Sequence, residues 1–416
     1  MGSDNNTFLP RMRRIVGRAA FNYEDKELIV LQDGLQLSDQ QICVLRSTLL
    51  VVDLLDGKHS VQDIQKEIKE LTGLDVDSHV IDDLVCHLDQ ACLLDTDRYR
   101  EALQKKADEY RAKGFRPAAH AGMSYSSNAE ELDAELRTFF NGENGPGLPN
   151  YFSASQRPVG LIAPHIDMRA GGKCFAHGYH ALASGQPSDV YVIFGTGHEG
   201  VEDLFTLTRL NFESPLGMVE TDRAFIDAVE QELGYDPCTE ELRHEKEHVI
   251  EFQTVMLQHV FGRRHSFKVV PILVALSPLA FSDDSRFERD RMMFDDFCSA
   301  IKNVVSRSNK SVCFIASADL DHVGPRYNDP IVPQQETVDD SIRKDKEMLA
   351  HLERVDLDAF IQYVINENDE RHICGFSPIS AMLRCMNASE GQLLDLDVVQ
   401  VDQYGSFVSY CSLIFH

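Results

Sequence analysis

The chain has 416 residues, and its 40 basic and 67 acidic side chains give a formal net charge of −27. Hydrophobic residues make up 43% and charged residues 26%, as in ordinary globular proteins, and the length exceeds that of one usual hydrophobic core, so we expect two domains. The acidic charge repels phosphate backbones and anionic lipids, which argues against partners that are nucleic acids or membranes.

The amino terminus and the cysteines indicate the compartment. Met1–Arg14 is polar and then basic, without the apolar stretch of a signal peptide, and no run approaches the ~20 apolar residues of a membrane span. We therefore expect a cytoplasmic protein. Its ten cysteines form no CxxC pair, so reduced thiols are expected. Six of them lie in apolar runs and are predicted to be core residues: Cys43, Cys86, Cys92, Cys298, Cys313 and Cys411.

Residues 1–97 predict a small winged-helix-like α+β domain. The run LIVLQDGLQLSD is typical of a strand, a glycine turn and a second strand fragment. QQICVLRSTLLVVDLLDG then has helical spacing up to Gly57, Ser60 is the expected N-cap of a second helix, and Asp77 or Ser78 begins a third.

The stretches LLDGKHSVQDI and VIDDLVCHLDQACLLD in this region resemble the PqqD-like family of peptide-recognition domains. The resemblance implies an edge strand that pairs with an extended peptide or protein partner. A generic helical domain is the alternative interpretation.

Residues 98–114 predict a helical connector, and residues 115–416 a single α/β domain. Runs rich in Val and Ile alternate with helical patterns, which is typical of a largely parallel sheet flanked by helices. The expected strands are 159–165, 189–198, 267–276 and 311–320, the expected helices are 174–184, 223–233, 249–261 and 289–305, and a hairpin turning at Tyr404-Gly405 ends the chain.

Polar loops follow three of these strands, at the edge where doubly wound sheets bind their ligands. They are APHIDMRAGG, GTGHEG and SADLDHVG, and HEKEHVIE adds a fourth cluster. Several histidines at one edge of a sheet point to a metal, for which carboxylates would orient the rings. The residues concerned are His165, Asp167, His198, His244, His248, Glu251, Asp319, Asp321 and His322.

Six motifs in order resemble the Memo family: RPAAHAGMSYSS, LIAPHIDMRAGG, VIFGTGH, EKEHVIE, IASADLDHVG and RHICGFSPISAML. The resemblance implies the fold of the class III extradiol dioxygenases, which use non-haem iron. It places the family's two-histidine, one-cysteine metal site on His165, His198 and Cys374. It also assigns catalytic positions to His322, Asp319 and His248.

The sequence departs from the family pattern beside these positions. PHIDMRAGG replaces PHAGYxYSG, which removes aromatic residues and adds Asp167. Thr196-Gly197 precedes His198, and Val323 follows His322 where the family has Trp. The pocket wall therefore differs, and no family substrate is transferred.

Two imidazoles and one thiolate suit iron, copper or zinc, and the resemblance to proteins with the fold of the extradiol dioxygenases implies iron. Imidazole moves protons near neutrality, so His322 is the expected general acid or base.

The first hypothesis is a metal-dependent oxidoreductase of dioxygenase type. A non-catalytic peptide- or protein-binding module and a zinc hydrolase are the alternatives. The chain resembles the protein B type of the AmmeMemoRadiSam system, in which prokaryotic Memo-like proteins are often encoded beside a radical-SAM enzyme and a third small partner. The resemblance implies these proteins as partners.

Overall fold

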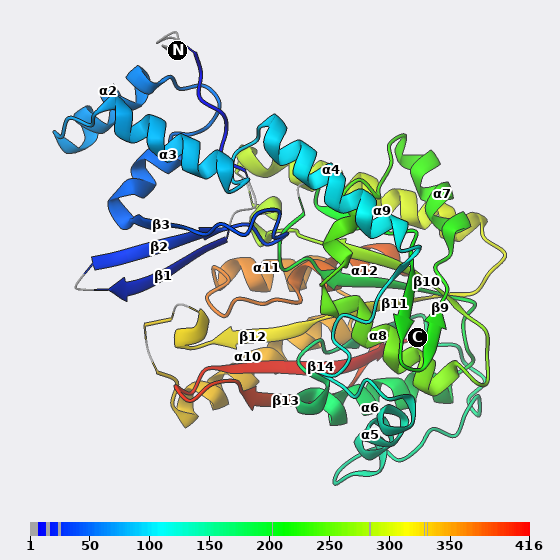
Figure 1. The fold of residues 1–416 in the computed structure, drawn as a ribbon. Coiled ribbons are helices and arrows are strands. Elements are labelled where there is room, and N and C mark those ends of the chain that lie inside the picture. Colours follow the sequence, from blue (N-terminus) through cyan, green and yellow to red (C-terminus); the bar gives the residue numbers. More distant parts are fainter. Residues whose placement is uncertain are drawn as a thin grey trace. The chain divides into compact units, whose positions relative to one another are not determined.

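The computed structural model describes residues 7–13, 17–23, 26–201, 203–282, 284–327, 329–330 and 332–416. The chain divides into two compact units, Met1–Lys113 and Gly114–His416 (Figure 1). Among the described residues, no helix is long and apolar enough to cross a membrane. Met1–Asn6 and Arg14, on which the predicted lack of a signal peptide partly depends, lie outside the described residues.

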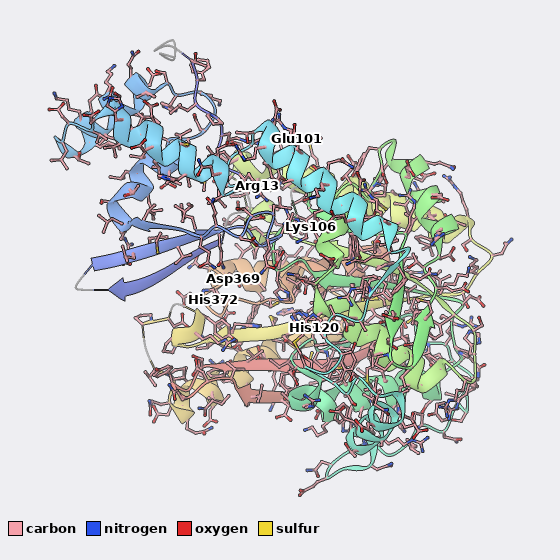
Figure 2. The ribbon with its side chains drawn as sticks, viewed as in Figure 1. Arg13, Glu101, Lys106, His120, Asp369 and His372 are labelled. Carbon is pink, nitrogen blue, oxygen red and sulfur yellow. The ribbon has the colours of Figure 1, made fainter. Side chains whose placement is uncertain are left out.

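The first unit is an α+β structure, as predicted. Its antiparallel sheet has the order β1-β2-β3, and its core lies between that sheet and the helices. Figure 2 labels Arg13 and Lys106 in this unit. The elements are β1 (Gly17–Tyr23), β2 (Lys26–Gln32), β3 (Ile42–Leu45), α1 (Leu49–Asp53), α2 (Val61–Thr72), α3 (Ser78–Gln90) and α4 (Asp97–Ala112).

Local capping chemistry explains why α2 and α3 begin where predicted. Ser60 and Asp63 form a reciprocal capping box at the start of α2. The Asp77 side chain accepts from the His79 backbone N–H at the start of α3.

The predicted helix ending at Gly57 is wrong over its first part. Ile42–Leu45 forms β3, and only Leu49–Asp53 continues as α-helix. Every second residue of β3 is exposed, and pairing with β2 satisfies its backbone, so a tertiary contact overrides the helical spacing. Cys43 on β3 is one of these exposed residues, and Cys86 on α3 is exposed as well. The prediction that both cysteines lie in the core is therefore wrong.

The second unit is built on a mixed eight-stranded sheet with the order β12-β14-β5-β11-β6-β10-β7. Strands β5, β11, β6 and β10 run parallel, whereas the outer pairings are antiparallel. Strand β13 pairs with β14 in the predicted terminal hairpin. The strands are β5 (Gly160–Ala163), β6 (Val190–Thr196), β7 (Phe205–Leu207), β10 (Lys268–Val274), β11 (Val312–Ser317), β12 (Asp319–Val323), β13 (Gly391–Gln400) and β14 (Phe407–Phe415). A small sheet joins β4 (Phe115–Arg116), β8 (Asn211–Ser214) and β9 (Gly217–Val219).

Helices cover both faces of the large sheet, which gives three layers (Figure 1). Alternate residues of β6 explain this: Val190, Val192 and Phe194 enter one core, and Tyr191 and Ile193 enter the other. The first core includes α7 (Arg223–Leu233), α9 (Glu288–Arg307), α10 (Gln335–Glu353), α11 (Leu357–Asn366) and α12 (Phe376–Cys385). The second includes α5 (Ala129–Asn141), α6 (Met168–Ser184) and α8 (His248–Phe261). The predicted α/β class is confirmed.

Candidate metal centre

His165 follows β5 at the carboxyl edge of the parallel strands. Its side chain is only 2% exposed, and its Nδ1 lies 3.0 Å from the Ser317 carbonyl oxygen at the end of β11. Because a carbonyl only accepts, Nδ1 must donate, which leaves the lone pair of a neutral ring on Nε2. The main chain of the neighbouring strand therefore fixes the ring and its tautomer.

His198 and His248 share one carboxylate. His198 follows β6, and His248 opens α8, where Glu247 is the N-cap. Glu247 Oε1 lies 3.1 Å from His198 Nδ1 and 3.0 Å from His248 Nδ1. Its Oε2 accepts from the His198 backbone N–H at 3.0 Å. With both Nδ1 atoms engaged, each ring has Nε2 left for a ligand.

The three histidines form one cluster whose ligand atoms lie within 4.8 Å of one another. The His165 ring centroid is 5.1 Å from that of His198 and 5.5 Å from that of His248. The His198 and His248 rings stack with centroids 5.1 Å apart. This group could hold a metal ion.

Cys374 joins this cluster from the segment that precedes α12. Its Sγ is 3.2 Å from His165 Nε2 and 3.4 Å from His198 Nε2. The Cys374 backbone N–H donates to the Leu320 carbonyl at 3.2 Å, and the Thr196 hydroxyl donates to the Cys374 carbonyl at 2.9 Å. The fold thus brings all three predicted ligands together and adds His248 beside them.

Asp319 and His322 lie on β12. Asp319 Oδ1 accepts from the backbone N–H of His165 at 2.8 Å and of Ile166 at 3.1 Å, and its Oδ2 is 3.6 Å from His165 Nε2. His322 Nδ1 is 3.1 Å from the Leu320 carbonyl, and its ring contacts Tyr327 edge-on at 4.9 Å between centroids. Both predicted catalytic groups are therefore held by main-chain contacts.

The environment shifts the pKa values of these groups apart. Burial lowers the pKa of His165 well below its ordinary value, and burial lowers the pKa of His322 to about 4. Burial raises the pKa of Asp319 to about 6, although hydrogen bonds from the backbone partly oppose it. Near neutrality His322 is thus a neutral base, and Asp319 exchanges its proton closest to neutral pH.

Charge pairing dominates around Glu247. Burial alone would lower the pKa of His198, but contacts with Cys374 and Glu247 raise it well above its ordinary value. Burial alone would raise the pKa of Glu247, but His198 and His248 lower it well below its ordinary value. A proton therefore competes with any metal for His198.

Other polar residues singled out in the sequence have structural contacts. Asp167 is the N-cap of α6, and the buried His244 has its Nε2 3.1 Å from the Thr206 carbonyl. Glu251 is fully buried, where it pairs with Arg116 and accepts from the Tyr125 hydroxyl.

Asp321 belongs to a buried ion network behind β12. Arg371 Nη1 is 2.5 Å from Asp321 Oδ1 and 2.7 Å from Asp345 Oδ1. The Arg371 carbonyl accepts from the His322 backbone N–H at 2.8 Å. This arginine thus joins the segment leading to Cys374 to the strand that carries His322.

Sequence reasoning missed the contributions of Glu247, Thr196 and His120. Glu247 is the N-cap of α8, but glutamate is not one of the usual N-cap residues and the expected helix began at Val249, so only the acidic residue next to His248 could have pointed to it. His120, labelled in Figure 2, contacts the His248 ring edge-on at 5.6 Å between centroids. His120 lies in the first of the six motifs, but the sequence does not show that it contacts His248, because 128 residues separate the two rings.

Comparison with known proteins identifies the family of the chain. A family model described as a Memo-like protein matches residues 116–414. The chain belongs to the Memo-like family. A MEMO1 family protein of Aquifex aeolicus is 26% identical over 397 residues, which cover 95% of this chain and 97% of that relative. A MEMO1 family protein of Methanopyrus kandleri is 30% identical over 310 residues, which cover 72% of this chain and 98% of the relative.

The matched segment of this Memo-like protein contains all three histidines of the candidate metal site, His165, His198 and His248. The similarity to the Aquifex aeolicus relative spans 95% of the chain and so extends into the first unit. The PqqD-like character of that unit stays a prediction.

Proposed function

We propose that this Memo-like protein is a non-haem iron redox enzyme of dioxygenase type, with His165, His198 and Cys374 as ligands. The proposal rests on one observation: Cys374 Sγ lies within 3.4 Å of Nε2 of both histidines, whose Nδ1 atoms are engaged elsewhere. His248 is an additional nitrogen donor in the same cluster.

The donor set fits iron. Neutral imidazoles and a thiolate form a borderline-soft set with one negative charge, which suits divalent iron and also accepts copper or zinc. When bound, iron would supply a redox couple and an electrophilic position for dioxygen or a substrate oxygen. Glu247 and the Ser317 carbonyl would hold the rings in the ligating tautomer.

Two side chains of the protein, His322 and Asp319, would accept and donate protons at this site. His322 has Nδ1 at the Leu320 carbonyl, which leaves Nε2 to accept a proton from substrate. Asp319, with a pKa of about 6, would hold or release a proton 3.6 Å from His165 Nε2. With these pKa values, both groups are mostly unprotonated near neutral pH, so either would first accept a proton from substrate and then return it.

Metal analysis after anaerobic purification tests the proposal. Near-stoichiometric iron in the native chain, strongly reduced in Cys374→Ser and His165→Asn, is the expected result. His177→Asn is the matched control, because His177 lies on α6 with its Nε2 3.0 Å from the Asn144 carbonyl, apart from the cluster. Zinc in place of iron would favour a hydrolase, and a metal-free native chain would favour a binding module.

We also propose that the protein acts with a radical-SAM-associated system that modifies a peptide or protein, bound through the first unit. Strands β1 and β3 are the edges of its sheet, and an edge strand is a site where an extended peptide can add. Crosslinking of the full chain with a purified radical-SAM enzyme from the same organism is the test. Absence of any crosslink between β1 or β3 and that enzyme or its peptide would contradict the proposal.

A further inference from the structure

A second cavity in the Memo-like unit is independent of the metal cluster. Its volume is about 550 Å³, within the range of small-molecule pockets. It is lined by α5, the hairpin of β8 and β9, and the carboxyl end of α8 with the following turn. None of the metal-cluster residues lines it.

The lining of this cavity is not acidic overall, although the chain carries a net charge of −27. Its lining includes three arginines and two histidines, against three acidic residues. The cationic or titratable members are Arg137, Arg263, Arg264, His259 and His265, and the acidic members are Glu130, Asp133 and Glu220.

Two of the three carboxylates already have partners. Asp133 binds Arg137 Nε at 2.9 Å and His259 Nδ1 at 3.1 Å. Glu220 pairs with Lys268, which is outside the lining, at 3.1 Å. Glu130 is thus the one lining carboxylate without a side-chain ion pair among the described residues.

The arginines differ in how much of their hydrogen-bonding capacity is used. Arg264 lies 3.8 Å above the Tyr151 ring centroid, and its Nη1 is 3.4 Å from the Val260 carbonyl. Arg137 uses one nitrogen on Asp133. Arg263 has neither a hydrogen bond nor an ion pair from its side chain within the described residues. A guanidinium group offers five donors in a planar fork, so most donors here remain for a ligand.

Apolar side chains complete the wall. Leu148 and Met218 both line the cavity and are each 46% exposed. Tyr151 adds an aromatic ring beneath Arg264. Apolar surface next to spare guanidinium donors favours a ligand that is itself amphipathic.

We propose that this cavity binds a small organic anion with a phosphate or carboxylate head and an apolar body. Arg263 and Arg137 bind the head, and Leu148 and Met218 contact the body. Charge-assisted bonds from a planar guanidinium group to the head are expected to contribute about tenfold to affinity for each arginine.

Calorimetric titration of the full chain with naphthyl phosphate, naphthoate, naphthol and inorganic phosphate tests the proposal. Saturable binding of at least one naphthyl anion, tighter than naphthol and inorganic phosphate, is expected. The stronger of the two anions identifies the head group. Arg263→Gln and Arg137→Gln are each expected to weaken binding of that naphthyl anion about tenfold. Met218→Ser is expected to weaken binding of the naphthyl anion but not of inorganic phosphate.

Arg286→Gln is the matched control, because it removes the same charge from a side chain that is 81% exposed outside this cavity. Equal weakening in Arg286→Gln and Arg263→Gln would show a general charge effect and overturn the proposal. Absence of saturable binding of both naphthyl anions at millimolar concentration would overturn it too. Arg263 is an exposed residue, so thermal melting of the variant is expected to match that of the native chain.

Discussion

Glu247→Gln removes the negative charge of the carboxylate that contacts both His198 and His248, while it preserves the length of the side chain. In the native chain, Glu247 Oε1 lies about equally far from His198 Nδ1 and His248 Nδ1, at 3.1 and 3.0 Å. A glutamine offers one carbonyl oxygen and one NH₂ group, so if the oxygen faces the two rings, the NH₂ group opposes the His198 backbone N–H, which donates to Oε2 in the native chain. Loss of such an orienting partner typically costs 10- to 100-fold in metal affinity, or about 1.4–2.8 kcal/mol.

The same change weakens the start of α8, because Glu247 is its N-cap and accepts from the His248 backbone N–H at 2.9 Å. Loss of the negative charge at the N-terminus of a helix costs about 0.3–1 kcal/mol of folding stability. The two effects are measured separately, by anaerobic competition of iron against a chelator and by urea unfolding of the metal-free protein. Glu288→Gln is the control, since it removes an acidic charge from the first turn of α9.

Metal affinity of Glu247→Gln within twofold of that of the native chain and of Glu288→Gln would refute this reasoning. The shared carboxylate would then not orient the rings. A loss of folding stability without a loss of affinity would assign Glu247 to capping alone.

Four further outcomes are expected. Cys374→Ser removes the thiolate-to-metal charge-transfer absorption of the cobalt-loaded protein but keeps nitrogen-coordinated cobalt, and an unchanged spectrum would exclude Cys374 as a ligand. Metal occupancy should fall as the pH falls, because protons compete with the metal for His198. Contacts with Cys374 and Glu247 raise the pKa of His198, although burial acts in the opposite direction. Metal titration at a series of pH values measures this. Arg371→Met leaves the buried carboxylates of Asp321 and Asp345 without their partner, so the free energy of unfolding measured in urea should fall by about 3–5 kcal/mol. The exposed control Arg343→Met should change it by less than about 1 kcal/mol. Burial lowers the pKa of His244 to about 3. The neutral side chain therefore contributes to stability fully above its unfolded pKa of about 6.5, and this contribution decreases as the pH falls from 6.5 toward 3. In His244→Gln, the free energy of unfolding in urea should depend less steeply on pH, by up to one proton.

Local patterns determined most of the helices and strands. Helix α7 has the predicted bounds, and α2 begins at its predicted cap, because capping and apolar spacing act within a few residues of one another. The terminal hairpin likewise follows from two apolar runs around Tyr404-Gly405. The prediction failed at Ile42–Leu45, where pairing with β2 decides between strand and helix.

The candidate site was only partly predictable. The order of motifs identified His165, His198 and Cys374, and the structure brings them within hydrogen-bonding distance. The sequence included His248 among the candidate site residues, but it could not tell that the His248 ring stacks on His198, that Glu247 contacts two rings, or that Asp321 pairs with Arg371.

The sequence by itself determined the class of the fold, the acidic character of the chain and the residue types available for a metal. Tertiary structure decided which nitrogen of each ring is left for a ligand and which carboxylates are buried. His165 and Cys374 are 209 residues apart in the chain, and their contact exists because β5, β6 and β11 end at one edge of the sheet. The pKa values of Asp319 and His322 likewise come from burial by segments distant in sequence, and no local pattern encodes that burial.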